Sequence, residues 1–451
     1  MSDAKAMPAG FGLATTTFVV ISSMVGAGVL TTSGFTVKAV GSNELMLALW
    51  VVGGVVALCG ALSLAEVSAA LPASGGDYVF LYEAFGPLAA FLSGWVSFLI
   101  GFAAPIAATS FASAKYLLAP LGLEEPTALR AQRGLATVAI LILAAVHNST
   151  RERTIRVQAS MTVVKLGVLL ALTVAGLAVG WRNGANLLDR PPIDAHVAGR
   201  MAFSLVYISY AYTGWNAAAY LAGEVGDPGR RLPRAMLLGT GAVVALYLGL
   251  NLMYALALPA AEVAKLDDVG PIAELAGRRL FGDRVAAPLS VAVGLTLLAS
   301  LSAYVLTGPR VLYAMARAGQ FPAVAGRLSA RSQTPAVATA VQVGWALVVL
   351  WSGSLAGILV YASVGLALFS MLAVSSIYVL RVTRPDLPRP FRTPGYPAVP
   401  AVFLLVTALL TAAAFANQPW QSGYALLSIL AGIPVYYLSR WTVGARAGSA
   451  P

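Results

Sequence analysis

The chain has 451 residues, of which 59% are hydrophobic and 10% are charged, and its formal net charge at pH 7 is +11. Since about a quarter of the residues of a soluble domain are charged, this composition excludes a soluble globular protein and indicates an integral membrane protein. A strongly basic soluble protein would suggest a nucleic-acid partner, but the basic residues here lie mainly in short polar connections. We therefore expect the protein to be surrounded by membrane lipid and to have no nucleic-acid partner.

Twelve apolar segments reach or approach the length of a membrane span, since an α-helix needs about 20 apolar residues to cross a bilayer. They lie near residues 11–38, 44–70, 87–118, 133–148, 156–181, 200–223, 234–258, 286–314, 335–352, 355–381, 397–416 and 422–440. The sequence therefore predicts an all-α integral membrane protein with twelve transmembrane helices. An even number of spans places the terminal segments 1–10 and 441–451 on the same side.

The arginine residues predict which side that is. Basic residues gather in the connections on the side of the N-terminus, namely RERTIR (151–156), DPGRRLPR (227–234), RVTRPDLPRPFR (381–392), Arg317, Arg327 and Arg331. The opposite loops near 353 and at 417–421 contain no Lys or Arg, and the longer loops 182–200 and 262–285 mix basic with acidic residues. Because cytoplasmic loops carry the excess of Lys and Arg, we expect both termini in the cytoplasm, in a bacterial inner membrane.

The first span contains the stretch ISSMVGAGVLTTSG (21–34), in which Gly26 and Gly28 lie close together. Each glycine costs about 1 kcal/mol relative to alanine inside a helix, so the pair predicts local unwinding. A nucleotide-binding GxGxxG motif is excluded, because Thr31 stands where the third glycine belongs and no strand precedes the motif. Packing of small residues between helices is the other explanation of the pair.

The second span contains the only cysteine, Cys59. A single cysteine excludes an intrachain disulfide and a cysteine-rich metal site, and its place inside a span gives no reason to expect a disulfide-linked subunit. The two histidines, His147 and His196, lie outside the span centres. We find no nucleophile–base pair, acid pair or metal ligand set for a membrane enzyme and no charged ring or filter motif for a channel. We expect no enzyme activity, no cofactor and no metal.

The fifth span contains Lys165 within QASMTVVKLGVLLAL (158–172). Arg156 marks the cytoplasmic end nine residues earlier, so Lys165 lies roughly 13 Å deeper at about 1.5 Å per residue. This depth is near the middle of a hydrocarbon core about 30 Å thick. Snorkelling to the surface is the alternative, but a lysine at this depth indicates a functional residue.

The sixth span, SLVYISYAYTGWNAAAYLAGEV (204–225), has Thr213-Gly214-Trp215-Asn216 at its centre. This interruption lies five spans after the first one and at a similar depth. Two interrupted helices in corresponding positions of two halves indicate a transporter built from inverted repeats.

Five segments resemble the amino acid–polyamine–organocation (APC) superfamily of transporters, which have the LeuT-type fold. They are MVGAGVL (24–30), LPASGGDYVFL (71–81), YAYTGWNAAAYLAGEVGDPGRRLPRA (210–235), GPRVLYAMARAGQFP (308–322) and LPRPFRTPGYPAVP (387–400). The Gly-Trp-Asn of the sixth span resembles the branch of L-type and related bacterial amino acid transporters. The resemblance implies a 5+5 inverted repeat, formed by residues 11–181 and 200–381, in which helices one and six are broken. Residues 397–440 would form two appended helices, eleven and twelve, and transport would proceed by alternating access.

The resemblance also implies a substrate site at the two interruptions. The N–H groups of Gly26, Ala27 and Gly28 would bind the carboxylate of an amino acid, as helix N-termini bind anions. Carbonyl groups would bind its ammonium, namely those near Met24 and those of Tyr210, Ala211 and Thr213. Tyr210 would also act as an aromatic gate. Asn216 would contact either the substrate or carbonyl groups freed by the interruption.

Lys165 has a separate role in the resemblance, because a lysine of the fifth helix occupies the place of a sodium ion in sodium-independent members. Its ammonium would bridge carbonyl groups of the first helix and a hydroxyl of the eighth, Ser300 or Ser302. Ala27 departs from the serine that is frequent at its position, which removes a hydroxyl contact but keeps the backbone donor. A lysine in apolar surroundings can also lose its proton, so proton coupling stays open.

The distribution of acidic residues bears on the substrate. No Asp or Glu falls in the middle of the third, sixth, eighth or tenth span, and Glu66 and Glu224 lie near cytoplasmic helix ends. A cationic side chain of a substrate would lack a buried partner. We therefore expect sodium-independent transport of neutral L-amino acids, by exchange or by proton symport. The alternative is a cationic amino acid or polyamine permease of the same superfamily.

Overall fold

A computed structural model describes residues 11–73, 75–149, 151–181, 187, 196–266, 271–329 and 334–438. Within these ranges the regular secondary structure is helical, apart from one isolated parallel bridge between Phe11 and Val225. The predicted all-α fold is thereby confirmed. The terminal segments 1–10 and 441–451, which we expect in the cytoplasm, lie outside the described residues, as does Arg331.

Twenty-one labelled helices follow one another along the described chain, and residues 432–438 are also helical. The first half contains α1 (Leu13–Met24), α2 (Gly28–Val40), α3 (Asn43–Ala70), α4 (Asp77–Phe85), α5 (Pro87–Val96), the π-helix η1 (Ser97–Phe102), α6 (Ala103–Leu118), the 3-10 helix η2 (Ala119–Leu121), α7 (Thr127–His147) and α8 (Arg151–Gly180). The second half contains α9 (Val197–Ala211), the 3-10 helix η4 (Ala217–Glu224), α10 (Pro228–Ala257), α11 (Ala260–Ala264), α12 (Ile272–Phe281), α13 (Asp283–Arg317), the 3-10 helix η5 (Ala323–Gly326), α14 (Ala336–Ser352), α15 (Leu355–Thr383), α16 (Ala398–Asn417) and α17 (Pro419–Leu430).

Eight helices in the described part of the chain are long and apolar enough to cross a membrane. They are α3, the continuous helix 87–121, α7, the part of α8 from Ser160, α10, α13, α15 and α16. The pair α1 and α2, bent by 43°, passes the same test when it is taken as one span. The other three predicted spans coincide with shorter helices: α9 with η4, α14, and α17 with the helical residues 432–438.

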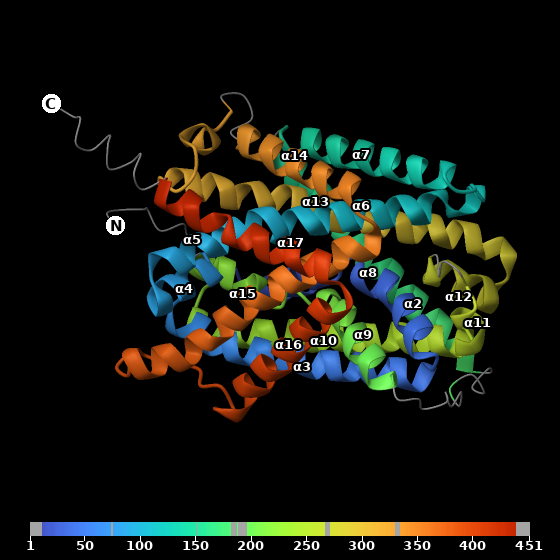
Figure 1. The fold of residues 1–451 in the computed structure, drawn as a ribbon, viewed down its shortest axis with the longest axis horizontal. Helices are drawn as coiled ribbons and strands as arrows, with labels where there is room; N and C mark the ends of the chain where they lie inside the picture. The colour runs from blue at the N-terminus through green and yellow to red at the C-terminus, as the bar shows by residue number, and fades with distance from the viewer. Residues whose placement is uncertain are drawn as a thin grey trace.

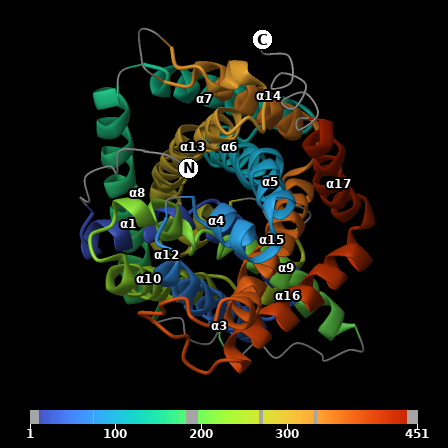
Figure 2. The ribbon, with the colours of Figure 1, turned by 90° about the vertical axis from the view of Figure 1, so that its left-hand side faces the viewer.

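The long helices run roughly along the longest axis of the molecule (Figure 1) and form a rounded bundle when they are seen end on (Figure 2). Helix α10 packs on α3 and α1, and α13 packs on α6 and α8. The short helix α4 lies at one end of the bundle, and α11 and α12 lie at the other (Figure 1). The two ends are thus built from different connections.

An aromatic cluster fills the core beside the end of α9. The ring centroids of Trp50 and Tyr212 are 5.5 Å apart, those of Trp50 and Tyr247 are 5.5 Å apart, and those of Tyr212 and Tyr247 are 5.2 Å apart. The Tyr212 hydroxyl also donates to the carbonyl of Trp50 at 3.1 Å. Since aromatic pairs add to the stabilisation from burial, this cluster holds α3, α10 and the residues after α9 together.

A second fixed point lies at the end of α3, where Glu66 is buried. Its carboxylate accepts two hydrogen bonds from Arg381, at 2.9 and 2.7 Å, and a third from the backbone N–H of Thr393 at 2.6 Å. The guanidinium of Arg381 lies 3.6 Å from the ring centroid of Tyr396. Bidentate arginine–carboxylate pairs are strong and directional, so this network ties α3 to α15 and to the connection after it.

Candidate functional site

The first interruption separates α1, which ends at Met24, from α2, which begins at Gly28. The helix ends fall inside the glycine-containing stretch, where a helix interior is least stable. The N–H groups of the first turn of any helix have no acceptor within that helix, and Ala27, at the N-cap of α2, provides no side-chain cap. The start of α2 therefore offers backbone donors and the positive end of a helix dipole to an anionic group.

The second interruption follows Ala211, the last residue of α9. Gly214 adopts φ +101°, a conformation that a residue with a side chain rarely adopts. The backbone N–H and the hydroxyl of Thr213 both donate to the carbonyl of Tyr210, at 3.1 and 2.7 Å. The Tyr210 carbonyl, which we expect to bind the ammonium, thus already has internal donors.

The two interruptions touch each other. A Cβ added to Gly28 would lie 2.4 Å from the Cα of Ala211, and one added to Gly214 would lie 2.8 Å from the carbonyl oxygen of Ser23. Two glycines therefore allow the main chains to approach more closely than side chains would permit. The structure thereby brings together the two groups of residues that the sequence assigned to the substrate, Met24 to Gly28 and Tyr210 to Thr213.

Two tyrosines from other helices, Tyr247 and Tyr304, border this crossing. The Tyr247 hydroxyl, on α10, donates to the carbonyl of Met24 at 2.8 Å. A Cβ added to Gly26 would lie 3.0 Å from the hydroxyl oxygen of Tyr304, on α13, and Tyr210 itself is buried. Sequence reasoning missed Tyr247 and Tyr304, since a tyrosine within an apolar span is as typical of packing as of a site.

Lys165 is buried, with 2% of its surface exposed. Its ammonium donates to the carbonyls of Ser22 at 3.2 Å and Val25 at 2.8 Å, and to the hydroxyl of Ser300 at 3.4 Å. The Ser300 hydroxyl donates to the same Val25 carbonyl at 3.0 Å. All these partners are carbonyl and hydroxyl oxygens of the described residues, as at a small cation site. Lys165 thus connects α8 to the end of α1 and to α13.

Ser302 points elsewhere. Its hydroxyl lies 2.8 Å from Nε2 of His147, on α7. Residues two positions apart in an α-helix are rotated by about 200° around the helix axis. Ser300 and Ser302 of α13 therefore face different neighbours. Of the two serines that the sequence left open, the structure places Ser300 beside Lys165 and Ser302 beside His147.

Asn216 contacts a carboxylate that sequence reasoning did not single out. Its Nδ2 donates to Oδ2 of Asp77 at 2.9 Å, and the hydroxyl of Tyr220 donates to the same oxygen at 3.2 Å. Asp77 begins α4, 139 residues before Asn216. An available signal was the Asp between Gly-Gly and Tyr in the stretch LPASGGDYVFL, since an acidic residue beside tight-turn residues often has a local partner.

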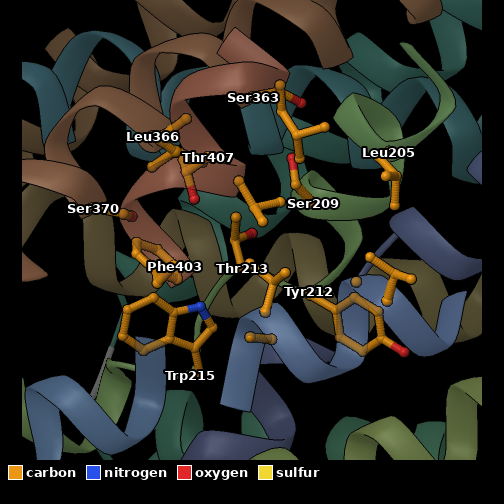
Figure 3. Close-up of a pocket in the computed structure, with 17 residues that line it drawn as sticks. Leu205, Ser209, Tyr212, Thr213, Trp215, Ser363, Leu366, Ser370, Phe403 and Thr407 are labelled. Atoms are coloured by element: carbon orange, nitrogen blue, oxygen red, sulfur yellow. The ribbon is translucent and has the colours of Figure 1, made fainter. Parts of the chain in front are cut away.

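A mainly apolar groove lies on one side of the second interruption, between α3, α9, α15 and α16 (Figure 3). Thr213 and Trp215 contribute to its wall, and the Trp215 ring lies edge-on to Phe403 with centroids 5.7 Å apart. Residues 24–28 do not line it. The groove therefore borders the crossing of the two interruptions without containing it.

Comparisons with known proteins identify relatives of the chain. A model of the amino acid permease family matches residues 11–436. The human cystine/glutamate transporter is 29% identical over 422 residues, which cover 93% of this chain and 83% of that protein. The mouse Asc-type amino acid transporter 1 is 28% identical over 443 residues, or 97% and 82% of the two chains. The human large neutral amino acids transporter small subunit 2 is 28% identical over 439 residues, or 95% and 79%.

These relatives are transporters rather than enzymes, and the family match extends over both interruptions and Lys165. They confirm the resemblance found in the sequence motifs. The chain belongs to the amino acid permease family of the APC superfamily, and it is a multi-pass membrane transporter of amino acids.

Proposed function

We propose that this transporter carries neutral L-amino acids across the cell membrane without sodium, by alternating access. The observation that supports this proposal most directly is the contact between Gly28 and Ala211, where the two interrupted segments meet. An amino acid is a zwitterion, and its burial is unfavourable unless both charges have partners. Backbone N–H groups and carbonyls that meet at one crossing provide both signs without ionised side chains.

In this site the N–H groups of Gly26, Ala27 and Gly28 bind the carboxylate, and the carbonyls of Ala211 and Thr213 accept from the ammonium. The carbonyls of Met24 and Tyr210 contribute when Tyr247 and Thr213, which donate to them in this structure, rearrange. Tyr210 covers the substrate as a gate. Asn216 acts indirectly, since its amide is held by Asp77.

Lys165 provides the fixed positive charge that a sodium ion would otherwise supply. Its three oxygen partners, on the end of α1 and on α13, are of the kind that coordinate a small cation. A covalently attached cation makes an added ion unnecessary. Among the two serines, Ser300 is the hydroxyl partner, and Ser302 supports the site only through its contact with His147.

We propose the following architecture for the transport cycle. Residues 11–181 and 200–381 form two inverted repeats of five spans, interrupted at the α1–α2 and α9–η4 junctions, and residues 397–440 form spans eleven and twelve. Both termini lie in the cytoplasm, on the side of the arginine-rich connections. The interrupted helices move against the remaining spans to expose the site alternately.

The partners of the chain are membrane lipid and a small-molecule substrate. One relative is named as a small subunit, so the question of a second subunit arises. The only cysteine, Cys59, lies within the transmembrane helix α3. For this reason we propose that no disulfide-linked subunit is attached.

One observation favours the second candidate, a cationic amino acid or polyamine permease. Asp77 is a buried carboxylate near the second interruption, and a buried acid is what a cationic substrate would require. Its Oδ2 accepts hydrogen bonds from Asn216 and Tyr220, and it lies on α4 rather than at the crossing. We therefore favour neutral substrates.

Uptake of labelled alanine into proteoliposomes tests these assignments, with each unlabelled amino acid and a polyamine as competitors. Competition by small neutral amino acids, and none by lysine, arginine or the polyamine, is the expected result. Strong competition by the cationic compounds would favour the second candidate. Uptake that requires an internal amino acid indicates exchange, and uptake driven by external acid indicates proton symport.

A further inference from the structure

Asp77 is a buried carboxylate that the proposed substrate site does not use. Its residue surface is 8% exposed, and its Oδ2 accepts the hydrogen bonds from Asn216 and Tyr220. Its other oxygen, Oδ1, is buried without a hydrogen-bond partner among the described residues. Burial of an ionised carboxylate with an unsatisfied oxygen is unfavourable. A proton on Oδ1 would remove the charge and leave both hydrogen bonds to Oδ2 in place.

The neighbours of Asp77 connect three segments at one end of the bundle. Gly76 lies flat against Tyr220, since a Cβ added there would be 2.9 Å from the ring carbons. The hydroxyl of Tyr78 accepts from the side-chain amide of Gln320 at 3.3 Å. We refer to these contacting residues as the clasp: Gly76, Asp77, Tyr78, Asn216, Tyr220 and Gln320. They join the start of α4, the segment after α9 and the residues after α13.

The proposed membrane orientation places all three segments on the cytoplasmic side, because they follow the second, sixth and eighth spans. In alternating access, the segment after the second interruption has to move relative to α13. The clasp holds this segment to the start of α4, and the Tyr78–Gln320 contact holds the start of α4 to the end of α13. A movement of this segment away from α13 would therefore separate the contacts of the clasp.

Burial raises the pKa of the Asp77 carboxyl from 3.8 to about 6, although the hydrogen bonds from Asn216 and Tyr220 oppose the rise. Tyr220 is the titratable side chain in contact with it. Helices α5 and α15 pack on α4, and α5 carries no ionisable side chain. The arginines near the end of α15 pair with other carboxylates, Arg381 with Glu66 and Arg384 with Glu83.

We propose that Asp77 is a proton-binding residue whose protonation keeps the clasp closed; this inference rests on the proposed transport function. Asp77 thereby makes the cytoplasmic opening of the transporter sensitive to internal pH. It acts as a positioning residue, because it reaches the substrate segment through Asn216 and Tyr220.

The direction of the pH dependence follows from linkage. The closed clasp binds the proton more tightly than the open one, in which a solvated carboxyl has its ordinary pKa. Acid therefore favours the closed state, and this effect disappears as the pH rises through about 6. With these two pKa values, the ratio of open to closed clasp falls about tenfold between pH 7.5 and pH 5.

The test compares the wild type with Asp77→Asn and with a matched control, Glu83→Gln. Glu83 lies on the same helix and pairs with Arg384 at the surface. Exchange of labelled alanine is measured with equal pH on both sides of the proteoliposome membrane, from pH 5 to pH 8. The wild type and Glu83→Gln are expected to slow about tenfold in acid, whereas Asp77→Asn is expected to show a flat profile at or below the acid rate. An Asp77→Asn profile like that of the wild type would overturn the proposal.

A second measurement does not require transport. Amide hydrogen exchange of residues 71–86 and 212–224, corrected for the intrinsic effect of pH, reports the closed clasp directly. Greater protection in acid is expected for the wild type and not for Asp77→Asn. Equal protection at both pH values would overturn the proposal. Clasp protection that follows pH in a protein that transports no amino acid would instead disprove the proposed function alone.

Discussion

Replacement of Gly28 by alanine tests the crossing of the two interruptions. The added Cβ would lie 2.4 Å from the Cα of Ala211 and 2.5 Å from its Cβ. Carbon atoms in contact are normally about 3.5–4.0 Å apart. The start of α2 and the end of α9 would therefore have to separate by more than about 1 Å, and the nearest atoms belong to backbone or to a Cβ that cannot rotate away.

The expected loss of stability is about 1–3 kcal/mol, which is the usual cost of overpacking a core. A gain of up to about 1 kcal/mol from replacing a helical glycine opposes it. The effect on substrate binding should be larger than the effect on stability. The N–H groups proposed to bind the substrate carboxylate and the carbonyls proposed to bind its ammonium would move apart. Each 1.4 kcal/mol of lost substrate binding lowers the affinity about tenfold, so we expect initial uptake to fall at least tenfold.

The assay is initial uptake of labelled alanine, together with the thermal unfolding midpoint of the purified protein. Gly241→Ala in α10 and Gly344→Ala in α14 serve as controls, because an added Cβ at either position has no heavy atom within 4 Å. Both controls should transport like the wild type and be as stable or slightly more stable. Wild-type uptake by Gly28→Ala, with an unchanged midpoint, would refute the close approach of the two segments.

Three further substitutions probe other contacts. Lys165→Met should abolish uptake and lower the unfolding free energy by about 1–3 kcal/mol, because buried oxygens lose their donor. Normal uptake would contradict the proposed role of Lys165, and Lys265→Met, at an exposed lysine, is the control. Glu66→Gln should lower the unfolding free energy by about 3 kcal/mol, since it breaks a buried ion pair, whereas Glu83→Gln should change it by less than about 1 kcal/mol. Tyr247→Phe should lower the KM for uptake severalfold, because the Met24 carbonyl then has no hydroxyl donor to give up before it accepts the ammonium, and it should lower the unfolding free energy by about 1 kcal/mol. An unchanged KM would exclude the Met24 carbonyl from the site.

The first interruption and Lys165 could be recognised in the sequence because their residue types are unusual within an apolar span. Two close glycines within an apolar span are unfavourable in a helix, and the helix ends at Met24 and Gly28 fall within that stretch. A lysine between apolar residues is equally conspicuous, and Lys165 is buried against oxygens of α1 and α13. Such local signals can be recognised without knowledge of the tertiary contacts.

Features that depend on the rotation of helices or on distant contacts could not be predicted in this way. Ser300 and Ser302 are equivalent in sequence, and only the orientation of α13 decides which one faces Lys165. Asn216 finds its partner, Asp77, on a separate helix. The positions of Tyr247 and Tyr304 beside the crossing likewise follow from packing.

The lengths of the helices also differ from the apolar segments of the sequence. The sixth predicted span, for example, contains α9 of 15 residues and then the 3-10 helix η4, and the last contains α17 of 12 residues before a turn at Ala431. Hydrophobicity indicates how much chain lies in apolar surroundings, but the ends of helices depend on caps and on local contacts. The number of apolar segments is therefore easier to predict than the regularity of each helix.

The central claim is that a lysine replaces sodium in an amino acid transporter. The most direct measurement is the initial rate of labelled alanine uptake by the wild-type protein in proteoliposomes, with sodium chloride replaced by choline chloride on both sides. Equal rates are expected in the two salts if the Lys165 ammonium occupies the place of the cation, as proposed. Uptake that requires sodium would contradict it.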